Sequence, residues 1–176
     1  MVFIRGRHPE ASISHYFRGG GDGYVFDETD GICEALIIAN ADRAVELFLA
    51  LAEHLPPAVQ VEIEDVRSGS RWQGDGLALL DARDAVARLK PLLASHAGVE
   101  FTIFGVDDQL TLTPNLDVFV YARTDRWLYL LERAGLQERP RVRGRLWRPA
   151  RGAFPPAVTL SAGVRTLVTS LAMQPA

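Results

Sequence analysis

Cysteine is almost absent from the 176-residue sequence: the one residue, Cys33, excludes a disulfide within the chain. Cys33 lies in the apolar run ICEALIIA, where a thiol behaves as a small hydrophobic side chain. The first ten residues, MVFIRGRHPE, carry charges from residue 5 and lack the apolar core of a secretory leader. No apolar run approaches the length that a bilayer-spanning helix needs. We therefore expect a cytoplasmic protein that does not contact membranes.

Motifs for nucleophilic and zinc chemistry are missing too. No serine stands in a G-x-S-x-G pattern. The 22 carboxylates guarantee that some pair lies close in space, so their number does not indicate a glycosidase. The histidines are scattered, without an H-x-x-x-H pair or neighbouring cysteines for zinc: His8, His15, His54 and His96. The sequence therefore favours a non-catalytic protein over an enzyme, and it predicts no cofactor and no metal.

The glycine-rich stretch RGGGDGYVFDETDG, residues 18–31, most resembles a ligand cradle. A P-loop needs Lys and Ser or Thr at the start of a following helix, whereas here an apolar strand follows. In an EF-hand alignment Gly31 takes position 6, so Phe26 and Ile37 take two ligand positions without a side-chain oxygen. We interpret its acids as solvated turn residues and as partner contacts, with a hard-cation site as the weaker alternative: Asp22, Asp27, Glu28 and Asp30.

Lysine is also nearly absent, since eighteen arginines stand against Lys90 alone. We attribute this to the base composition of the coding genome rather than to arginine chemistry. The formal net charge is −3, but it is unevenly distributed. Residues 138–151 hold six arginines and one glutamate, a net charge of +5, so the rest of the chain carries −8. With 48% hydrophobic and 23% charged residues, the composition is that of a globular chain.

Hydrophobic periodicity predicts both strands and helices. The segment AVQVEIEDV, residues 58–66, alternates apolar and polar side chains, so this strand has one solvated face. Two other strands, 99–106 and 116–122, are apolar on both faces, which favours a central place in the sheet for 116–122. The remaining predicted strands are 24–28, 32–39 and 110–113, and the predicted helices are 41–55, 81–95 and 125–136.

This order predicts a single α+β domain: a mixed, largely antiparallel sheet of five or six strands with three helices packed on it. An irregular segment, residues 1–23, precedes the compact α+β domain, residues 24–136. An arm rich in arginine and proline follows at 137–156, and a short apolar tail ends the chain at 157–176. The tail is expected to dock on the body or on a partner, including a second copy of the chain.

The segment RSGSRWQGDG, residues 67–76, is the best small-ligand candidate. We expect it to be a loop that leaves a strand and leads into a helix, where α/β sheets hold ligands. Two arginines are positioned to clamp an anion, two serines to donate hydroxyls, and a tryptophan to form a wall. These residues are Arg67, Ser68, Ser70, Arg71 and Trp72. Glycine, serine and aspartate also make up ordinary exposed loops, so the ligand site is an alternative hypothesis.

The basic arm has two interpretations. In an extended RVRGRLWR segment, alternate arginines form a row that suits phosphate contacts, with a tryptophan to stack on bases. Alternatively, the row lies beside Glu62 and Glu64 and neutralises them, and the acidic body favours this second interpretation. The arm residues concerned, which are partner-contact candidates in either case, are Arg141, Arg143, Arg145, Trp147 and Arg148.

The preferred hypothesis is a non-catalytic protein-binding module, an adaptor or a toxin-neutralising immunity-type protein. Acidic clusters at 22–34, 62–65 and 107–108 suit a basic protein partner, because opposite charge steers the encounter. Binding of a small anion at 67–76 and binding of nucleic acid by the arm are the alternatives.

Overall fold

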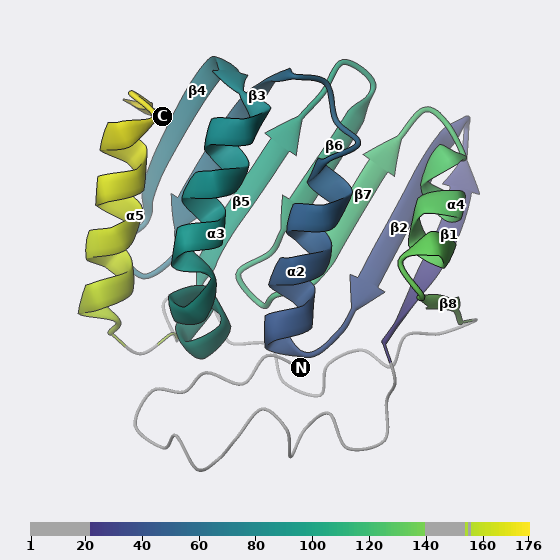
Figure 1. The fold of residues 1–176 in the computed structure, drawn as a ribbon, viewed down its shortest axis with the longest axis horizontal. Helices are drawn as coiled ribbons and strands as arrows, with labels where there is room; N and C mark the ends of the chain where they lie inside the picture. The colour runs from purple at the N-terminus through teal and green to yellow at the C-terminus, as the bar shows by residue number, and fades with distance from the viewer. Residues whose placement is uncertain (1–21, 140–153, 155) are drawn as a thin grey trace.

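The computed structural model describes residues 22–139, 154 and 156–176, and it shows an α+β fold (Figure 1). In these residues, nine strands form one open sheet in the order β8-β1-β2-β7-β6-β5-β3-β4-β9. The strands are β1 (Gly23–Thr29), β2 (Ile32–Ile38), β3 (Ala58–Asp65), β4 (Ser70–Ala78), β5 (Val99–Phe104), β6 (Asp108–Leu112), β7 (Val118–Ala122), β8 (Gln137–Glu138) and β9 (Gln174–Pro175). The helices are α2 (Ala41–Ala52), α3 (Leu79–His96), α4 (Arg126–Arg133) and α5 (Val158–Ser170).

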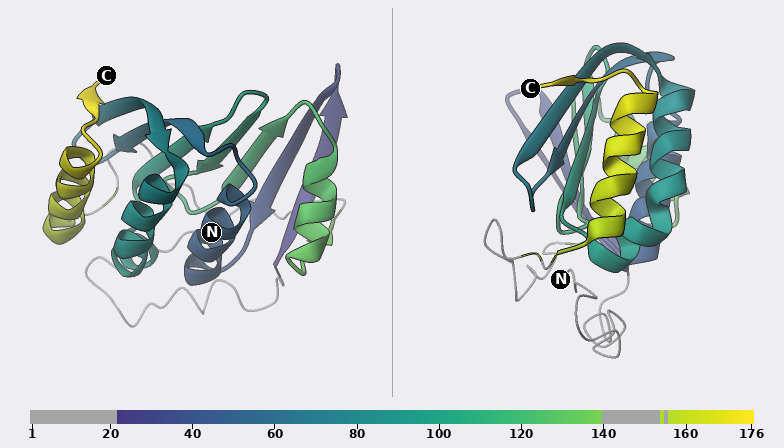
Figure 2. Two further views of the ribbon diagram at one scale, coloured as in Figure 1. Left: turned by 45° about the horizontal axis from the view of Figure 1, so that its top comes forward. Right: turned by 90° about the vertical axis from the view of Figure 1, so that its left-hand side faces the viewer.

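All four helices lie on one face of the sheet, as the two views of Figure 2 show. The strands turn every second side chain toward this helix layer. Across the middle strands these side chains are fully buried, as in Ile37, Ile63, Phe101, Leu110 and Val120. They join the buried stripes of α2, α3 and α5 in one continuous hydrophobic core. The fold therefore has two layers, with the core between them.

The predicted α+β class and the largely antiparallel sheet are confirmed, since among the described strands only the β1–β8 pair is parallel. The predicted counts of five or six strands and three helices are wrong, because nine strands and four helices form in the described residues. Two of the additional strands, β8 and β9, are two-residue edge strands too short to show any periodicity. The additional helix is α5, within the apolar tail.

The prediction that residues 67–76 form a loop is wrong for most of this segment. Residues 70–78 instead form β4, which pairs with β3 over most of its length. Gly74 and Gly76 suggested a loop, but they lie where the register shifts opposite Val59 and Val61, at a β-bulge. The bulge tolerates glycine inside a strand, so the turn-like composition was misleading.

The hairpin between β1 and β2 closes through a two-residue turn, Asp30–Gly31. Thr29 pairs with Ile32, and both turn residues have positive φ, 54° and 76°. This is the conformation of a type I′ turn, which favours Asp-Gly because the residues must adopt left-handed backbone angles. Asp30 therefore has a local structural role.

The C-terminal tail packs against the domain at the β4 edge of the sheet, opposite the β1 edge. Helix α5 buries Leu160, Val164, Leu167 and Val168, and it packs beside α3 (Figure 1). Gly163 permits the close approach, because a Cβ there would lie 2.7 Å from Leu89 Cδ2. Strand β9 then pairs with β4 and covers part of its edge.

Candidate protein-binding face

The sheet surface that points away from the helices is called the open face here. In the described part of the chain no helix or further strand lies over it (Figure 2). Its side chains come from the strand positions that alternate with the buried ones. The pairing register places them in rows across the sheet, and the middle row reads Val25, Leu36, Phe119, Thr111, Thr102, Glu62 and Gln73.

Apolar side chains form a diagonal band across the open face, the apolar diagonal. It runs from Ile38 and Leu36 on β2, through Phe119 and Tyr121 on β7, to Phe104 on β5, and Gln109 on β6 lies between Tyr121 and Phe104. All five side chains are half-buried, and none of them belongs to the hydrophobic core on the helix side. The rings of Phe119 and Tyr121 lie parallel, with centroids 6.2 Å apart. The diagonal is therefore apolar surface outside the core.

Carboxylates lie on both sides of the apolar diagonal. Asp27 and Glu34 pair across β1 and β2 at one corner, and both are exposed. Glu62, Glu64 and Glu100 lie at the opposite corner, on β3 and β5. Among the strand positions that point to this face, the basic residue is Arg71, whose Nη2 lies 2.9 Å from Glu64 Oε2. The paired strand positions thus place five carboxylates and one arginine on the open face.

Two threonines at the centre of the open face separate the apolar diagonal from the acidic corner on β3 and β5. Their hydroxyl oxygens, Thr102 Oγ1 and Thr111 Oγ1, lie 3.0 Å apart and share a hydrogen bond. Gln109 Nε2 donates to Thr111 Oγ1 at 3.1 Å. Both threonine hydroxyls therefore have hydrogen-bond partners within the sheet, so they do not oppose the burial of their neighbours under a partner.

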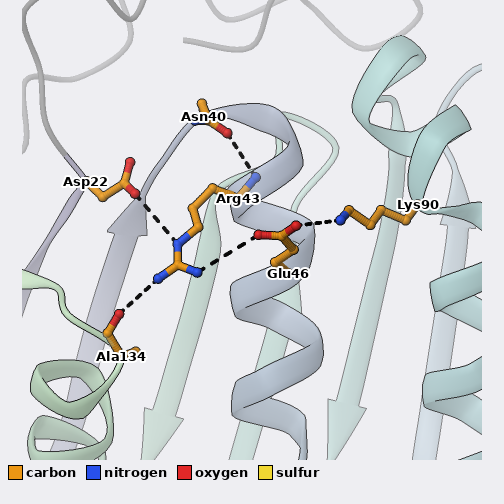
Figure 3. A network of polar contacts seen from close by, with 6 residues as sticks. All are labelled: Asp22, Asn40, Arg43, Glu46, Lys90 and Ala134. Carbon is orange, nitrogen blue, oxygen red and sulfur yellow. Dashed lines mark hydrogen bonds and ion pairs between the residues drawn. The ribbon is translucent and has the colours of Figure 1, made fainter.

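The predicted acidic contacts occupy different places. Asp27, Glu62 and Glu64 lie on the open face, whereas the register points Glu28 toward the helix side. Figure 3 shows that Asp22 belongs to another cluster: Arg43 Nε lies 3.7 Å from Asp22 Oδ2.

The cluster of Figure 3 joins four elements near the start of α2. Arg43 Nη2 donates to the backbone oxygen of Ala134, and Arg43 also approaches Glu46, which pairs with Lys90 on α3. Asn40 Oδ1 accepts from Arg43 N at 2.9 Å and caps α2. The hydrogen bond from Lys90 is the main cause that lowers the pKa of Glu46. This cluster links α2 to α3, to the residue after α4 and to the residue before β1, so it has a structural role.

The structure separates the candidate anion-binding residues of 67–76. Arg67 donates to the backbone oxygens of His96 and Ala97, at the end of α3, and its guanidinium lies 5.3 Å from the centroid of the Phe154 ring. Arg71 points to the open face from β4. Trp72 faces the helix side and packs against the core. Ser68 Oγ and Ser70 Oγ bond to each other at 2.9 Å. The five side chains therefore do not converge on one pocket, and ligand binding by them stays a prediction.

Arg67 caps α3 with its side chain. Carbonyl groups at a helix C-terminus lack partners within the helix and carry a partial negative charge, which a guanidinium satisfies. Burial is the main cause that lowers the pKa of Arg67, and Asp65 opposes the change. Asp65 is itself buried, and it accepts from Arg67 N and from Ser161 Oγ on α5. The two residues join β3, α3 and α5.

The arm candidates Arg141, Arg143, Arg145, Trp147 and Arg148 lie outside the described residues. The described start of the arm, Arg139, has a backbone N–H that donates to Tyr24 O at 2.9 Å. Its side chain passes over Gly23, at the edge of the sheet.

No catalytic cluster emerges from the described residues. Burial, with further contributions from Glu28 and Asp125, raises the pKa of the Cys33 thiol, which opposes a nucleophilic thiolate. A groove of about 420 Å³ between α3, the end of β4 and the end of α5 includes Ser170, whose hydroxyl donates to Leu167 O. The described part of the chain contains no group of three or more metal-ligating His, Cys, Asp or Glu residues. In the same residues, no helix combines the length and apolar character of a membrane span.

Sequence reasoning missed the apolar diagonal, although it noted its source. Segments 99–106 and 116–122 are predicted to be apolar on both faces, and 116–122 is predicted to lie centrally in the sheet. β5 and β7 are central in the strand order. The second face of each strand belongs to the open face, because every helix of the described residues covers the other one (Figure 2). For β7 this face is apolar, with Phe119 and Tyr121, whereas β5 places Glu100, Thr102 and Phe104 there, so the prediction of two apolar faces for 99–106 is wrong. An apolar second face in a sheet with one helix layer was the available signal.

Comparison of this chain with protein-family models, with curated proteins and with solved structures finds no match.

Proposed function

We propose that this protein is a non-catalytic binding module that captures a basic protein on its open face. The observation that carries the proposal is the apolar diagonal between two acidic corners, on a sheet face that no other element of the described chain covers. The proposal includes both an adaptor and a toxin-neutralising immunity-type protein, since both act by binding alone.

The chemistry of the open face favours a macromolecule over a small ligand. Small-molecule sites are concave, whereas these side chains are spread over neighbouring strands of a sheet. Apolar surface with a polar rim is typical of protein interfaces, whose cores are enriched in aromatic residues. Phe119 and Tyr121 supply such a core, with Phe104 on the far side of Gln109, and the carboxylates form the rim.

The charges of the open face support a basic partner. Asp27, Glu34 and Glu62 are exposed and form no ion pair within the described residues. Carboxylates at a rim accelerate association with a cationic surface and reject an anionic one. Salt screens exposed charges over about 8 Å at physiological ionic strength, so association should slow as salt is added. The same charges disfavour nucleic acid on this face, because its phosphates are repelled.

Affinity capture from the source cells tests the proposal with two matched double variants. Leu36→Ala/Tyr121→Ala removes apolar surface from the open face, while Leu80→Ala/Tyr129→Ala removes the same residue types from the helix layer, where they are 63% and 68% exposed. The parent protein and the second variant should retain one stoichiometric protein partner, and the first should lose it. Equal retention by both variants, or no stoichiometric protein partner of the parent, contradicts the proposal.

A further inference from the structure

We propose that the part of the partner that contacts the open face is a basic amphipathic helix that lies along the apolar diagonal. This inference rests on the proposed function and specifies the partner of the same face. Three properties of the open face support it: the length and direction of the apolar diagonal, the acids on both of its sides, and the paired state of the strand backbones beneath it.

The apolar diagonal has the dimensions of a short helix. From Ile38 on β2 to Phe104 on β5 there are three strand spacings, about 14 Å in all. The same two residues differ by four positions along the strands, about 13 Å. The diagonal is therefore about 20 Å long and crosses the strands at about 45°. A helix of about 13 residues has this length at 1.5 Å per residue.

The charges fit both edges of such a helix. An amphipathic helix presents an apolar stripe at positions i, i+3, i+4 and i+7, with polar residues along each edge. Asp27 and Glu34 lie on one side of the apolar diagonal, and Glu62 lies on the other. Basic residues on both edges of the stripe would therefore each meet a carboxylate. A helix with basic residues on one edge only would leave one acidic corner without a counterpart.

The backbone of the sheet disfavours an extended segment on the same face. β2, β7, β6 and β5 are each paired on both sides, so the ladders use their backbone N–H and C=O groups. An extended peptide laid over them would find few backbone partners, and its own polar groups would lose water on burial. A helix satisfies its backbone groups internally. An extended partner is better suited to a sheet edge, and β8 and β9 each pair with part of an edge strand, β1 and β4.

Synthetic peptides test the inference on the full-length protein. The probe is an alanine-based peptide of about 18 residues with leucine at i, i+3, i+4 and i+7 and lysine on both edges of that stripe. The first control has the same composition with the leucines dispersed around the helix, and the second alternates leucine and lysine as an extended strand does. Binding is measured by fluorescence anisotropy, and peptide helicity by circular dichroism. We expect the stripe peptide to bind at least about tenfold more tightly than either control and to gain helicity on binding.

Variants of the protein locate the binding. Phe119→Ala should weaken the affinity for the stripe peptide by about tenfold or more, whereas Tyr129→Ala on α4 should leave this affinity unchanged. The charge reversal Asp27→Lys/Glu62→Lys alters both sides of the apolar diagonal and should also weaken the affinity. Asp84→Lys/Glu132→Lys makes the same net change on exposed positions of α3 and α4 and serves as its control.

Each further outcome has a defined meaning. Equal or tighter binding of the strand-like peptide overturns the inference, as does binding that Phe119→Ala does not affect. Self-association that competes with the peptide on raising the protein concentration identifies a second copy as the occupant and overturns it. A cross-link from the open face to this chain's own 139–151 arm identifies the arm as the occupant and also overturns the inference. If the cellular partner is captured through the open face but contacts it with a non-helical segment, the proposed function stands and only the helix inference fails.

Discussion

The two faces of the sheet are built from the same strands and carry different chemistry. On the helix side, alternate residues such as Phe101 and Leu110 are fully buried in one core. On the open face, Phe119 and Tyr121 of β7 remain half-buried, and carboxylates surround them. Because strand side chains alternate, one segment supplies a core residue and a surface residue within two positions. Stability therefore depends mainly on the face that packs against the helices.

Truncation of one phenylalanine on each face gives the largest expected contrast. Phe101→Ala removes a fully buried ring from the helix side and should lower the free energy of unfolding by about 3–5 kcal/mol. Phe119→Ala removes a half-buried ring from the open face, so its cost should be under about 1.5 kcal/mol. Urea unfolding followed by circular dichroism measures both. Similar losses for the two variants would show that the open face is packed like a core.

The two arginines of the 67–76 segment give the next contrast. Arg67→Ala leaves the carbonyl groups at the end of α3 without their donor and should cost about 1–3 kcal/mol in unfolding free energy. Arg71→Ala removes an exposed ion pair with Glu64 on the open face, so its cost should stay below about 0.5 kcal/mol. Thermal and urea unfolding of both variants provide the measurement. A larger loss for Arg71→Ala than for Arg67→Ala would contradict the assigned roles.

The sequence predicted the α+β class and the largely antiparallel sheet because the patterns that indicate them are local. Alternation in 58–66 and helical spacing in 41–55 are local patterns, and both produced the expected elements. β4 was missed because its bulge carries glycines. The apolar residues of α5 follow helical spacing, but its β-branched residues also suit a strand, so the tail was predicted only as a short apolar element. No local pattern connects Arg67 with carbonyl groups some thirty residues away.

The composition of the open face could not be predicted from a single sequence either, because it depends on contacts between distant segments. Segment 116–122 shows two apolar faces, but only the arrangement of the helices decides which of them becomes the core. Acidic clusters in the sequence led to the prediction of partner contacts. Their arrangement as two corners around an apolar diagonal depends on the pairing of β1 with β2 and of β3 with β5, which is long-range information.

The pH dependence of stability tests the helix side further. Burial, with a smaller contribution from Arg67, lowers the pKa of His96 below its ordinary value of 6.5. The folded state therefore binds a proton less readily than the unfolded state does. His96 contributes this stability fully above pH 6.5, and it is lost as the pH falls from there through the lowered pKa. Urea midpoints measured in small pH steps should show this acid-side decline in the parent protein and a weaker one in His96→Gln. An equal decline in both would exclude His96 as the source.

The ion cluster at the start of α2 should give the smallest effect. Lys90→Ala removes the partner of Glu46 on an exposed surface of the helix layer, so the loss should be about 0.5 kcal/mol or less at low salt. High salt should reduce this difference further, because it screens exposed charges. Thermal unfolding at two salt concentrations measures it. A loss comparable with that of Phe101→Ala would mean that the cluster, and not the core, holds the helices in place.

The most direct test of the central claim is site-specific photo-cross-linking in the source cells. Benzoylphenylalanine replaces either Tyr121 on the open face or Tyr129 on α4, which is 68% exposed. If the open face binds a protein, irradiation should give one discrete cross-linked protein from position 121 and none from position 129. Cross-links from position 129 alone, or the same products from both positions, would contradict the claim.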